Sequence, residues 1–410
     1  MEKKDVIIVG GGPAGLAAAV ELHKLGITDI LILERERNLG GILRQCIHDG
    51  FGLTRFRESL SGPEYARRFI DQVVERNIPH LTEAMVIDIT SDRRVTVSTR
   101  EGILEFQAGA VVLAMGCRER TRGAVGIPGN RPAGIWTAGV AQSYINLHNT
   151  MVGREAVILG SGDIGMIMAR RLTLEGARVK AVFELMPYGS GLPRNIQQCL
   201  EDYGIPLFLS HTITDIKGRS RLEGVTVAQV DENLQAIPGT EKDWTCDTLI
   251  LSVGLIPENE LSLAAGVVLD SRTRGPVVDE NYQTNVAGIF AAGNVLQVHD
   301  LVDFVSLEAE NLAGSVARFV RENRLPECGI GIRGDSSILH TIPQRISAAS
   351  DFVLSLRVRR PFRNCEVRIT QGGKTIKTVA LAKAIPAEMI RIPIKASALS
   401  GTGTLEVAVL

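Results

Sequence analysis

The chain has 410 residues, 45% of them hydrophobic and 42 of them glycine, with a formal net charge of −1. This length suits two or three domains, and the glycine content is typical of an α/β protein with many tight turns. The balanced charge gives no nucleic-acid-binding footprint, and no apolar run approaches the roughly 18 residues of a membrane span. Residues 1–5 lead directly into an apolar strand, so we expect no secretory signal and a cytoplasmic protein.

The first 36 residues predict a strand, a helix and a second strand around a glycine fingerprint. Apolar residues 6–9 precede Gly10-Gly-Gly12-Pro13-Ala14-Gly15, a helical stretch covers 16–25, and Glu34 closes the apolar run 30–33. The first glycine makes the tight turn, the second admits a pyrophosphate, and the third lets the helix pack on the strand. The acidic residue can accept hydrogen bonds from a ribose hydroxyl. The segment therefore predicts a dinucleotide site.

Several elements separate this fingerprint from the next one. We expect a helix over 63–77, a strand over 85–89, a hairpin at 95–97 and 104–106, and a buried parallel strand over 110–116. The following loop, 117–132, is rich in Gly, Pro and Arg, which is typical of a crossing between domains. A helix over 137–149 then leads into a second strand–helix–strand unit.

The second unit repeats the first. Gly160-Ser-Gly162-Asp163-Ile164-Gly165 follows apolar residues 156–159, a helical stretch covers 166–175, and Glu184 closes the run 179–183. In both copies the acidic residue lies 19 positions after the third glycine. A single fingerprint of this form is weak evidence, but two in full context predict two dinucleotides and a reason to bring them together.

The pattern changes towards the C-terminus. After a buried strand at 248–254, a strand-to-glycine segment at 288–294 and a helix over 303–321, residues 328–410 alternate polar and apolar positions and predict a small β-sandwich-like domain. Residues 327–410 contain 12 Lys and Arg against 6 Asp and Glu, a net charge of +6. The arginines at 357, 359, 360 and 363 either dock an acidic protein surface or form a solvated strand face.

The six cysteines, at 46, 117, 199, 246, 328 and 365, are far apart in the sequence. They form no CxxC or CxxxxC motif and no cluster with the spacing of a zinc or iron–sulfur site. We therefore expect no dithiol, metal cluster or other metal site in this chain.

Taken together, these motifs resemble the two-dinucleotide-binding-domain flavoproteins of the pyridine nucleotide–disulfide oxidoreductase superfamily. The marks appear in the family order and include Glu34-Arg35, Gly40-Gly41, residues 114–116, 252–254 and 288–294 as well as both fingerprints. The resemblance implies two Rossmann-like domains, the first binding FAD and the second, inserted domain binding NAD(P)H. The implied domains are 1–118 with 255–326 for FAD, 119–254 for NAD(H), and 327–410 as a C-terminal β domain and candidate subunit interface.

The same resemblance assigns most of the site residues. Those expected to bind FAD are Gly10, Gly12, Pro13, Ala14, Gly15, Glu34, Arg35, Gly40, Gly41, Ile42, Val86, Ala114, Met115, Gly116, Gly293, Asn294, Val302 and Asp303. Those expected to bind NAD(H) are Gly160, Gly162, Asp163, Ile164, Gly165, Glu184 and Gly254. Asn294 stands where the family commonly has aspartate; an amide can still hydrogen-bond a ribityl hydroxyl.

Charge favours NAD(H) over NADP(H) in the second domain. Glu184 would repel a 2′-phosphate, and residues 185–188 supply no arginine to bind one. The implied chemistry is hydride transfer between the nicotinamide C4 and the flavin N5. The helix beginning near Val302 and Asp303 would place backbone N–H groups at the pyrimidine edge of the flavin.

A closer resemblance concerns residues 41–48, 50–52, 115–120 and 298–303. They are similar to the NAD/FAD-dependent subunits of anaerobic-type glycerol-3-phosphate dehydrogenases and, more distantly, of opine and proline dehydrogenases and sarcosine oxidase. The resemblance implies an electron-transfer subunit whose partners are a substrate-oxidising flavoprotein, an iron–sulfur subunit or a Cys-rich subunit. The alternatives are a stand-alone NADH oxidase or NADH:acceptor reductase, and a non-enzymatic assembly or redox-sensing protein, against which the two fingerprints argue.

Cys46 and His48 are the candidate reactive residues, because the matched segment lies near the flavin in the family. Cys46 stands where a redox dithiol would begin or end, but it lacks the second cysteine. A packing role for Cys46 and a structural hydrogen bond for His48 are the alternatives, and His299 beside Asp300 has the same two interpretations.

Overall fold

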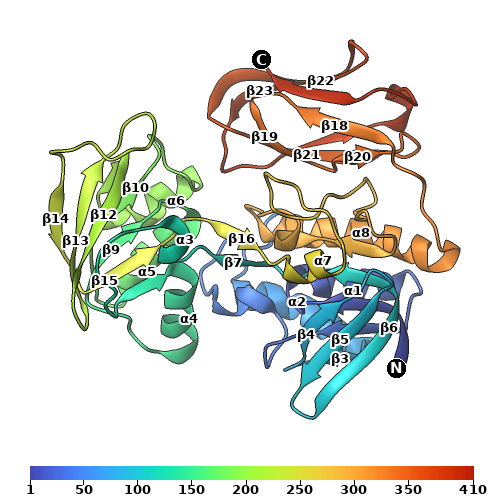
Figure 1. The fold of residues 1–410 in the computed structure, drawn as a ribbon, viewed down its shortest axis with the longest axis horizontal. Helices are drawn as coiled ribbons and strands as arrows, with labels where there is room; N and C mark the ends of the chain where they lie inside the picture. Colours follow the sequence, from blue (N-terminus) through green and yellow to red (C-terminus); the bar gives the residue numbers. More distant parts are fainter. The chain divides into compact units, whose positions relative to one another are not determined.

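The computed structural model describes residues 1–410 and divides into two compact units. The first unit contains Met1–Cys117 and Pro257–Leu410, and the second contains Arg118–Ile256. Two short strands at the connections between the units, β7 (Cys117–Glu119) and β16 (Leu255–Pro257), pair with each other. Each unit contains a parallel sheet packed with helices, next to antiparallel strands, and the predicted α/β class is confirmed (Figure 1).

The first unit is built on a sheet in the order β3-β2-β1-β6, with β17 also paired to β6. These strands are parallel: β1 (Glu2–Val9), β2 (Ile30–Leu33), β3 (His80–Leu81), β6 (Gly102–Leu113) and β17 (Ile289–Ala291). The first half of β6 instead pairs antiparallel with β5 (Arg94–Thr99), which pairs with β4 (Met85–Ile89). Parallel pairing places the carboxyl ends of β1, β2, β6 and β17 at one edge, where the glycine turns follow.

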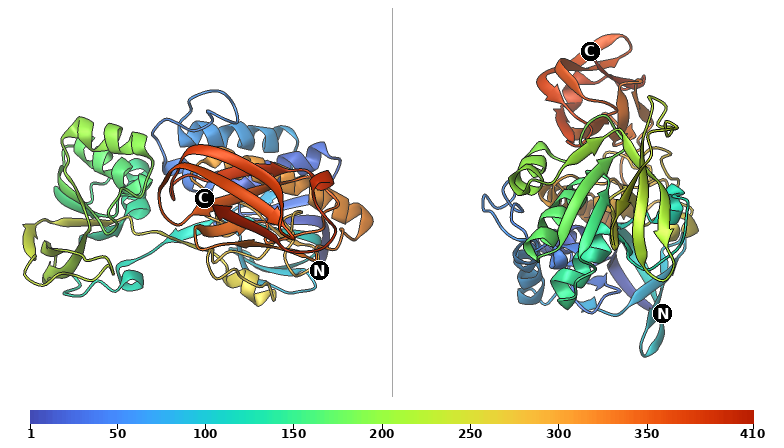
Figure 2. Two further views of the ribbon diagram at one scale, coloured as in Figure 1. Left: turned by 90° about the horizontal axis from the view of Figure 1, so that it is seen from above. Right: turned by 90° about the vertical axis from the view of Figure 1, so that its left-hand side faces the viewer.

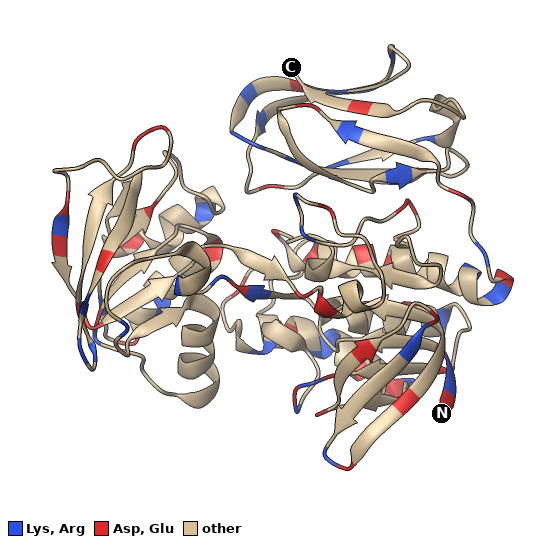
Figure 3. Cartoon of the chain, viewed as in Figure 1, with Lys and Arg blue, Asp and Glu red and all other residues tan.

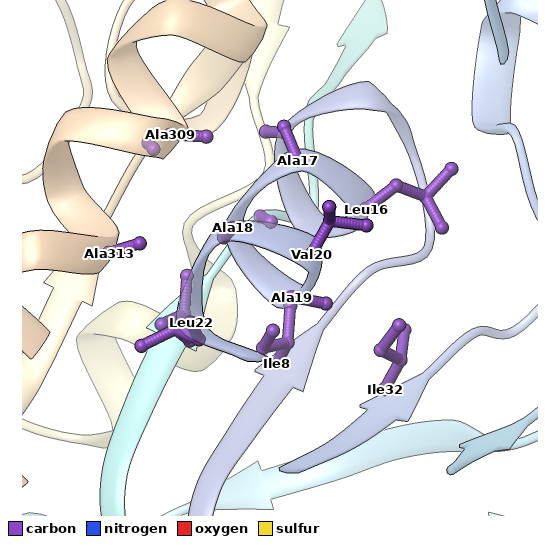
Figure 4. Close-up of a cluster of buried hydrophobic side chains, with 14 of the residues drawn as sticks. Ile8, Leu16, Ala17, Ala18, Ala19, Val20, Leu22, Ile32, Ala309 and Ala313 are labelled. Carbon is purple, nitrogen blue, oxygen red and sulfur yellow. The ribbon is translucent and has the colours of Figure 1, made fainter. Parts of the chain in front are cut away.

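Three main helices cover this sheet: α1 (Pro13–Lys24), α2 (Gly62–Glu75) and α8 (Val302–Glu322). The first is buried along most of its length, and its alanines share one core with those of α8. Figure 4 shows Ala309 and Ala313 on the face of α8 turned towards Ala18 and Leu22 of α1, above Ile8 of β1. Because these side chains are small, the two helices pack closely over the strand that leads into the first fingerprint. No helix combines the length and apolarity needed to cross a membrane.

The second unit repeats this plan in a smaller form. Its parallel sheet has the order β11-β10-β9-β15-β8, formed by β8 (Ile135–Thr137), β9 (Glu155–Leu159), β10 (Arg178–Glu184), β11 (Leu207–Leu209) and β15 (Thr248–Leu251). Its helices are α3 (Arg122–Val125), α4 (Ala138–His148), α5 (Asp163–Leu174) and α6 (Pro193–Cys199). An antiparallel sheet of β12 (His211–Gly218), β13 (Leu222–Gln229) and β14 (Lys242–Thr245) covers one face, with Phe183 packed against Trp244.

The C-terminal region forms the predicted β-sandwich (Figure 2). One sheet has the order β20-β18-β25-β22-β23 and the other β19-β21-β24. The strands are β18 (Ile330–Gly334), β19 (Ile338–Ile342), β20 (Arg345–Ile346), β21 (Phe352–Val358), β22 (Phe362–Gln371), β23 (Lys374–Ala384), β24 (Ile390–Ile394) and β25 (Leu405–Val409). The alternation in β21 confirms the predicted period, because Phe352, Leu354, Leu356 and Val358 are all buried.

The sandwich belongs to the same compact unit as residues 1–117. Main-chain and side-chain bonds join Gln344 to Val278, since Val278 N donates to Gln344 Oε1 (2.9 Å) and Gln344 N to Val278 O (3.0 Å). Basic residues outnumber acidic ones in the sandwich (Figure 3). The predicted arginine surface is smaller than expected, because Arg357 is half-buried and bonded to residues 298–300, whereas Arg359, Arg360 and Arg363 are exposed.

Candidate functional site

The first glycine turn is closed by backbone contacts that only glycine permits. Gly10 has a φ of +112°, and a Cβ at this position would lie 2.3 Å from Ala114 O. Its N–H donates to Leu33 O (2.8 Å), so the turn is held between β6 and β2. A Cβ on Gly15 would lie 1.9 Å from Gly10 O, which explains why the third glycine is required for α1 to pack at this distance.

The second glycine turn has the same contacts. Gly160 has a φ of +98°, and a Cβ there would lie 2.0 Å from Ser252 O. Its N–H donates to Phe183 O (2.7 Å). A Cβ on Gly165 would lie 2.6 Å from Gly160 O. The two turns are therefore equivalent in hydrogen bonding and in packing, which is stronger evidence for a shared ligand class than the shared sequence pattern.

The acidic residue of the first unit reaches back to its own fingerprint. Glu34 is buried and accepts hydrogen bonds from Gly11 N (2.8 Å) and Glu36 N (2.8 Å). A carboxylate held in this way has lone pairs left for ribose hydroxyls. Arg35, also expected at this site, has an exposed side chain next to it.

Glu184 makes the two corresponding contacts, accepting from Ser161 N (2.9 Å) and Met186 N (2.9 Å). In addition, its Oε2 accepts hydrogen bonds from the hydroxyls of Ser161 (2.6 Å) and Ser190 (2.8 Å). These two serines were not predicted as site residues. Ser161 stands at the second position of the fingerprint. A hydroxyl at this position, in a turn that is followed by an acidic residue at the end of the next strand, is the sequence signal that could have identified it.

Two further predicted segments, Gly40-Gly41 and Gly293, meet at the start of α1. Gly40 N donates to Gly11 O (2.8 Å), and a Cβ on Gly41 would lie 3.0 Å from Gly12 Cα. A Cβ on Gly293 would lie 2.9 Å from Ala14 Cβ. The structure thus brings together segments separated by about 280 residues in the chain, around the turn that the sequence identified.

Other predicted residues lie around this point in different environments. Met115 packs partly buried against the sheet, and Gly116 has a φ of +74° in open space. Val86 on β4 is buried in the core beneath the sheet, two residues after Ala84, whose N–H donates to Glu34 O (2.9 Å). Ile42, in the 3₁₀ helix η1 (Gly41–Gln45), is 56% exposed and is available to an incoming group.

Asn294 and Asp303 have protein partners that the sequence did not indicate. Asn294 Oδ1 accepts from His299 N (3.0 Å), and its Nδ2 donates to Cys117 Sγ (3.6 Å). The carboxylate of Asp303 accepts from Gly52 N (3.1 Å) and Arg55 N (2.7 Å). The side chain of Asp303 therefore holds the 52–55 loop, and only its main chain at the start of α8 is left to contact a cofactor.

Asp163 at the start of α5 is similar. Its Oδ1 accepts hydrogen bonds from Leu192 N (2.8 Å) and Asn195 Nδ2 (2.7 Å), which fixes the 189–192 loop beside the helix. Ile164 packs partly buried against the core of the second unit. Gly254 has a φ of +100°, and its carbonyl accepts from Arg120 N (2.9 Å). Backbone N–H groups at the start of α5 are therefore the groups that can face a phosphate.

Glu308 in α8 is a buried acid that was not predicted. It accepts hydrogen bonds from Gly293 N (2.8 Å) and Gln297 Nε2 (3.0 Å), and His299 Nε2 lies 3.3 Å away. Burial opposes its ionisation, but His299 and these donors together hold its pKa below the usual range. Nothing in the local pattern of α8 marks this residue, since its partners lie in the glycine segment before the helix.

Cys46 and His48 lie in the loop after η1. The Cys46 thiol donates to Ile42 O (3.4 Å), and burial raises its pKa to about 12. His48 Nδ1 lies 3.1 Å from Asp49 O, and the His48 ring packs 4.9 Å from that of Phe51. The structure contains no disulfide. A thiol with this pKa is protonated at neutral pH, which favours the packing role for Cys46.

We therefore expect Cys46→Ala to leave the anaerobic rate of flavin reduction by NAD(P)H within about twofold of the parent, because the thiolate required for redox chemistry is not populated. Stopped-flow absorbance at the flavin band measures this rate. Cys365→Ala, at a buried cysteine of the sandwich, controls for the loss of a packed thiol. A loss of more than about tenfold confined to the Cys46 variant would assign Cys46 a direct role.

The residues present fit a dinucleotide at each fingerprint. The N-cap glycines of α1 and α5 make no side-chain cap, so the first-turn N–H groups of α1 are not taken up by a capping side chain. In the first turn of α5, Gly165 N donates to Ser252 Oγ (3.1 Å). A Cβ on Gly12 would meet only Gly41 Cα, at 3.9 Å, so the backbone there is bare on its outer side. A pyrophosphate can therefore approach the main chain closely.

Comparison with known proteins agrees with this geometry. The model of the family described as "Pyridine nucleotide-disulphide oxidoreductase" matches residues 4–311. One of the subunits of an opine oxidase from Agrobacterium tumefaciens (strain Ach5) is 25% identical over 312 residues, which cover 71% of this chain and 61% of that protein. Hydrogen cyanide synthase subunit HcnB of Pseudomonas protegens is 26% identical over 286 residues, covering 64% and 58%. The chain thus spans about three fifths of the length of these relatives.

The solved structure of thioredoxin reductase from T. acidophilum superimposes with a TM-score of 0.63 at 24% identity, covering 78% of this chain and 99% of that one. This similarity shows the fold. Because the family model spans most of the chain and both fingerprints have the geometry of nucleotide-binding turns, the chain belongs to the pyridine nucleotide-disulphide oxidoreductase family, whose members typically use FAD and NAD(P)H.

Proposed function

We propose that the chain is the NADH-linked electron-transfer subunit of a dehydrogenase, with FAD at the first fingerprint and NAD(H) at the second. The observation that carries this proposal is that the two glycine turns share the same backbone contacts and each has a buried acid that accepts from the residue after the first glycine. One ligand class at two sites suits a chain that transfers hydride between two dinucleotides. FAD when bound supplies the hydride acceptor, and the chain's own residues supply position and charge.

In this proposal the first-turn N–H groups of α1 hold the FAD pyrophosphate and Glu34 holds its ribose. The start of α8, Val302 and Asp303, presents main-chain N–H groups to the pyrimidine edge, where they stabilise negative charge. The side-chain amide of Asn294, which is held by His299 N, is the group proposed to contact the ribityl chain. Glu184 and the start of α5 hold the nicotinamide nucleotide.

The sequence supports the proposal of a partner, because no evident electron acceptor is found within the chain itself. The sequence has no closely spaced cysteine pair, and no group of three or more His, Cys, Asp or Glu side chains could hold a metal ion. Two relatives are named as subunits, one of an opine oxidase and the other, HcnB, of a hydrogen cyanide synthase. We therefore propose a substrate-oxidising flavoprotein of the glycerol-3-phosphate dehydrogenase type, with an iron–sulfur or Cys-rich subunit, as the partner, and the cytoplasm as the location.

The purified chain tests this proposal directly. We expect it to be yellow, to bleach with NADH under anaerobic conditions, and to react slowly with oxygen. Affinity purification from native cells should recover a dehydrogenase flavoprotein with it. A chain that holds no flavin would contradict the proposal, and rapid NADH consumption in air without any partner would instead identify a stand-alone NADH oxidase.

Glu184 is expected to set the preference for NADH. In the parent chain kcat/KM should favour NADH over NADPH by about 100-fold, because the buried carboxylate repels a 2′-phosphate. Glu184→Gln removes the charge and keeps one acceptor oxygen, which can still accept from Ser161 N, while its NH2 group can no longer accept from Met186 N. The ratio should therefore fall to about tenfold or less. Anaerobic flavin reduction with each nucleotide measures the ratio.

Glu34→Gln is the matched control, since it makes the same change at the equivalent position of the first unit. We expect it to weaken FAD binding and to leave the NADH/NADPH ratio unchanged. An equal change in the ratio for both variants, or a parent that prefers NADPH, would show that Glu184 does not discriminate between the nucleotides.

A further inference from the structure

The segment between the last glycine motif and α8 is held by the C-terminal sandwich. This segment, residues 296–301, follows the 3₁₀ helix η3 (Gly293–Val295). Arg357 on β21 donates from Nη2 to Val298 O (3.1 Å) and lies 3.2 Å from Asp300 Oδ1. Its Nη1 donates to Pro386 O (2.8 Å), so the guanidinium joins the segment to the sandwich. The side chains of Arg357 and Asp300 are only 11% and 7% exposed.

Two neighbouring contacts extend this junction to the first turn of α8. Met389 N donates to the other carboxylate oxygen of Asp300 (3.4 Å). The guanidinium of Arg391 lies 4.7 Å from the ring centroid of Phe304. The sandwich therefore contacts both the segment and the start of the helix that the flavin is expected to meet.

The opposite side of the segment is tied to the glycine motif. His299 N donates to Asn294 Oδ1 (3.0 Å), and Glu308 accepts from Gly293 N and Gln297 Nε2 while facing the His299 ring. A shift of residues 298–300 would therefore move Asn294, Gly293 and the N-terminus of α8 together. The bonds on the two sides make the segment a rigid connection between the sandwich and the cofactor site.

Arg357 is the cation that this junction uses to hold the buried Asp300. His340 on β19 pairs with Arg357 across the sheet and is neutral at physiological pH, because burial and the charge of Arg357 lower its pKa to about 4. Removing Arg357 would leave the Asp300 carboxylate buried with the Met389 N–H but without its guanidinium partner, and the segment would have to rearrange to solvate it.

The sandwich side of this junction, with Arg357, Met389 and Arg391, lies outside the part of the chain that matches the family. The family model ends at residue 311, and the matched thioredoxin reductase is covered almost completely by 78% of this chain. We infer that Arg357 is a positioning residue for the flavin site, acting through Val298 and Asp300 to hold the start of α8. This inference rests on the proposed assignment of FAD to the first fingerprint. The inference gives the C-terminal sandwich a role in setting the affinity for FAD and the reduction potential of the bound flavin.

Three variants test the inference on the full chain. We expect Arg357→Leu to weaken FAD binding by about tenfold and to make the reduction potential of the bound flavin more negative, because the N–H groups of α8 are less well placed. Arg357→Lys should restore part of both changes, since it returns the charge without the two-pronged donor. Arg359→Leu, at an exposed arginine two residues away, should match the parent. Reconstitution of the apoprotein measures affinity, and dye-coupled anaerobic titration measures the potential.

A folded Arg357→Leu variant, shown by a cooperative thermal transition, with parental FAD affinity and potential would overturn the inference. If that variant does not fold, Asp300→Asn tests the same contact from the other side and should shift the potential in the same direction; an unchanged potential in it would also overturn the inference. A parent chain that holds no FAD would instead remove the proposed function on which the inference rests, so the two failures are distinguishable.

Discussion

We expect Gly10→Ala to yield a chain that no longer retains FAD. The new Cβ would lie 2.3 Å from Ala114 O. Gly10 and Ala114 directly follow paired strands and are held by backbone hydrogen bonds to Leu33 O and Val9 O, so neither residue can move away cheaply. The φ of +112° adds conformational strain of about 1–3 kcal/mol for any residue with a side chain. Together these effects should exceed about 3 kcal/mol, which corresponds to at least a 100-fold loss of FAD affinity. Flavin absorbance after gel filtration measures the loss.

Gly102→Ala is a control that separates the backbone strain of a positive φ from the steric clash of the new Cβ in Gly10→Ala. Gly102 has a φ of +131° in the same unit, but a Cβ there would meet nothing within 4 Å. We expect this control to be modestly less stable and to remain yellow. If both variants hold FAD equally well, the closed turn at Gly10 is not what makes the site.

Gly160→Ala separates the two halves of the proposed reaction. Its Cβ would lie 2.0 Å from Ser252 O at a φ of +98°, so the nicotinamide turn should open as the flavin turn does in Gly10→Ala. Because Gly160 belongs to the other compact unit, the variant should keep its FAD. It should bleach with dithionite but at least about 100-fold more slowly with NADH. Anaerobic absorbance with each reductant measures both properties.

Gly176→Ala is the matched control in the second unit. Gly176 has a φ of +86° and nothing lies within 4 Å of a Cβ built on it, so alanine there would add backbone strain but no steric clash. NADH should reduce this variant at close to the parental rate. Loss of FAD from Gly160→Ala would show that the two sites are not independent.

The elements were predictable where the sequence pattern is local. Buried strands such as β1 and β9 are short apolar runs, the alternation in β21 has a period of two, and α2 begins at Gly62 because Ser61 and Glu64 form a capping box. The glycine turns belong to this class as well, since Gly10 and Gly15 contact each other within a few residues. Patterns of this kind report the conformation of their own segment.

Side-chain roles were less predictable, because their partners lie far away in the chain. The main chain near Asp303 is expected at the flavin; the structure adds that the Asp303 carboxylate accepts from Gly52 N and Arg55 N, about 250 residues earlier. Asp163 is expected at NAD(H); the structure adds that its carboxylate accepts from Leu192 N and Asn195 Nδ2. Arg357 was expected on a basic surface and instead holds a buried segment. Spacing in a sequence carries no information on such pairs.

The sequence by itself determined the α/β class, both nucleotide turns and the sandwich, because each depends on a short pattern whose conformation is set by nearby residues. Only the tertiary structure decided that Gly40, Ala114 and Gly293 meet at the start of α1. It also decided that Glu308 and Asn294 hold residues 293–299, and that the sandwich contacts residues 298–300 through Arg357. These contacts join residues that are far apart in the sequence. They form only when the parallel strands bring their carboxyl ends to one edge of the sheet and the following segments pack there.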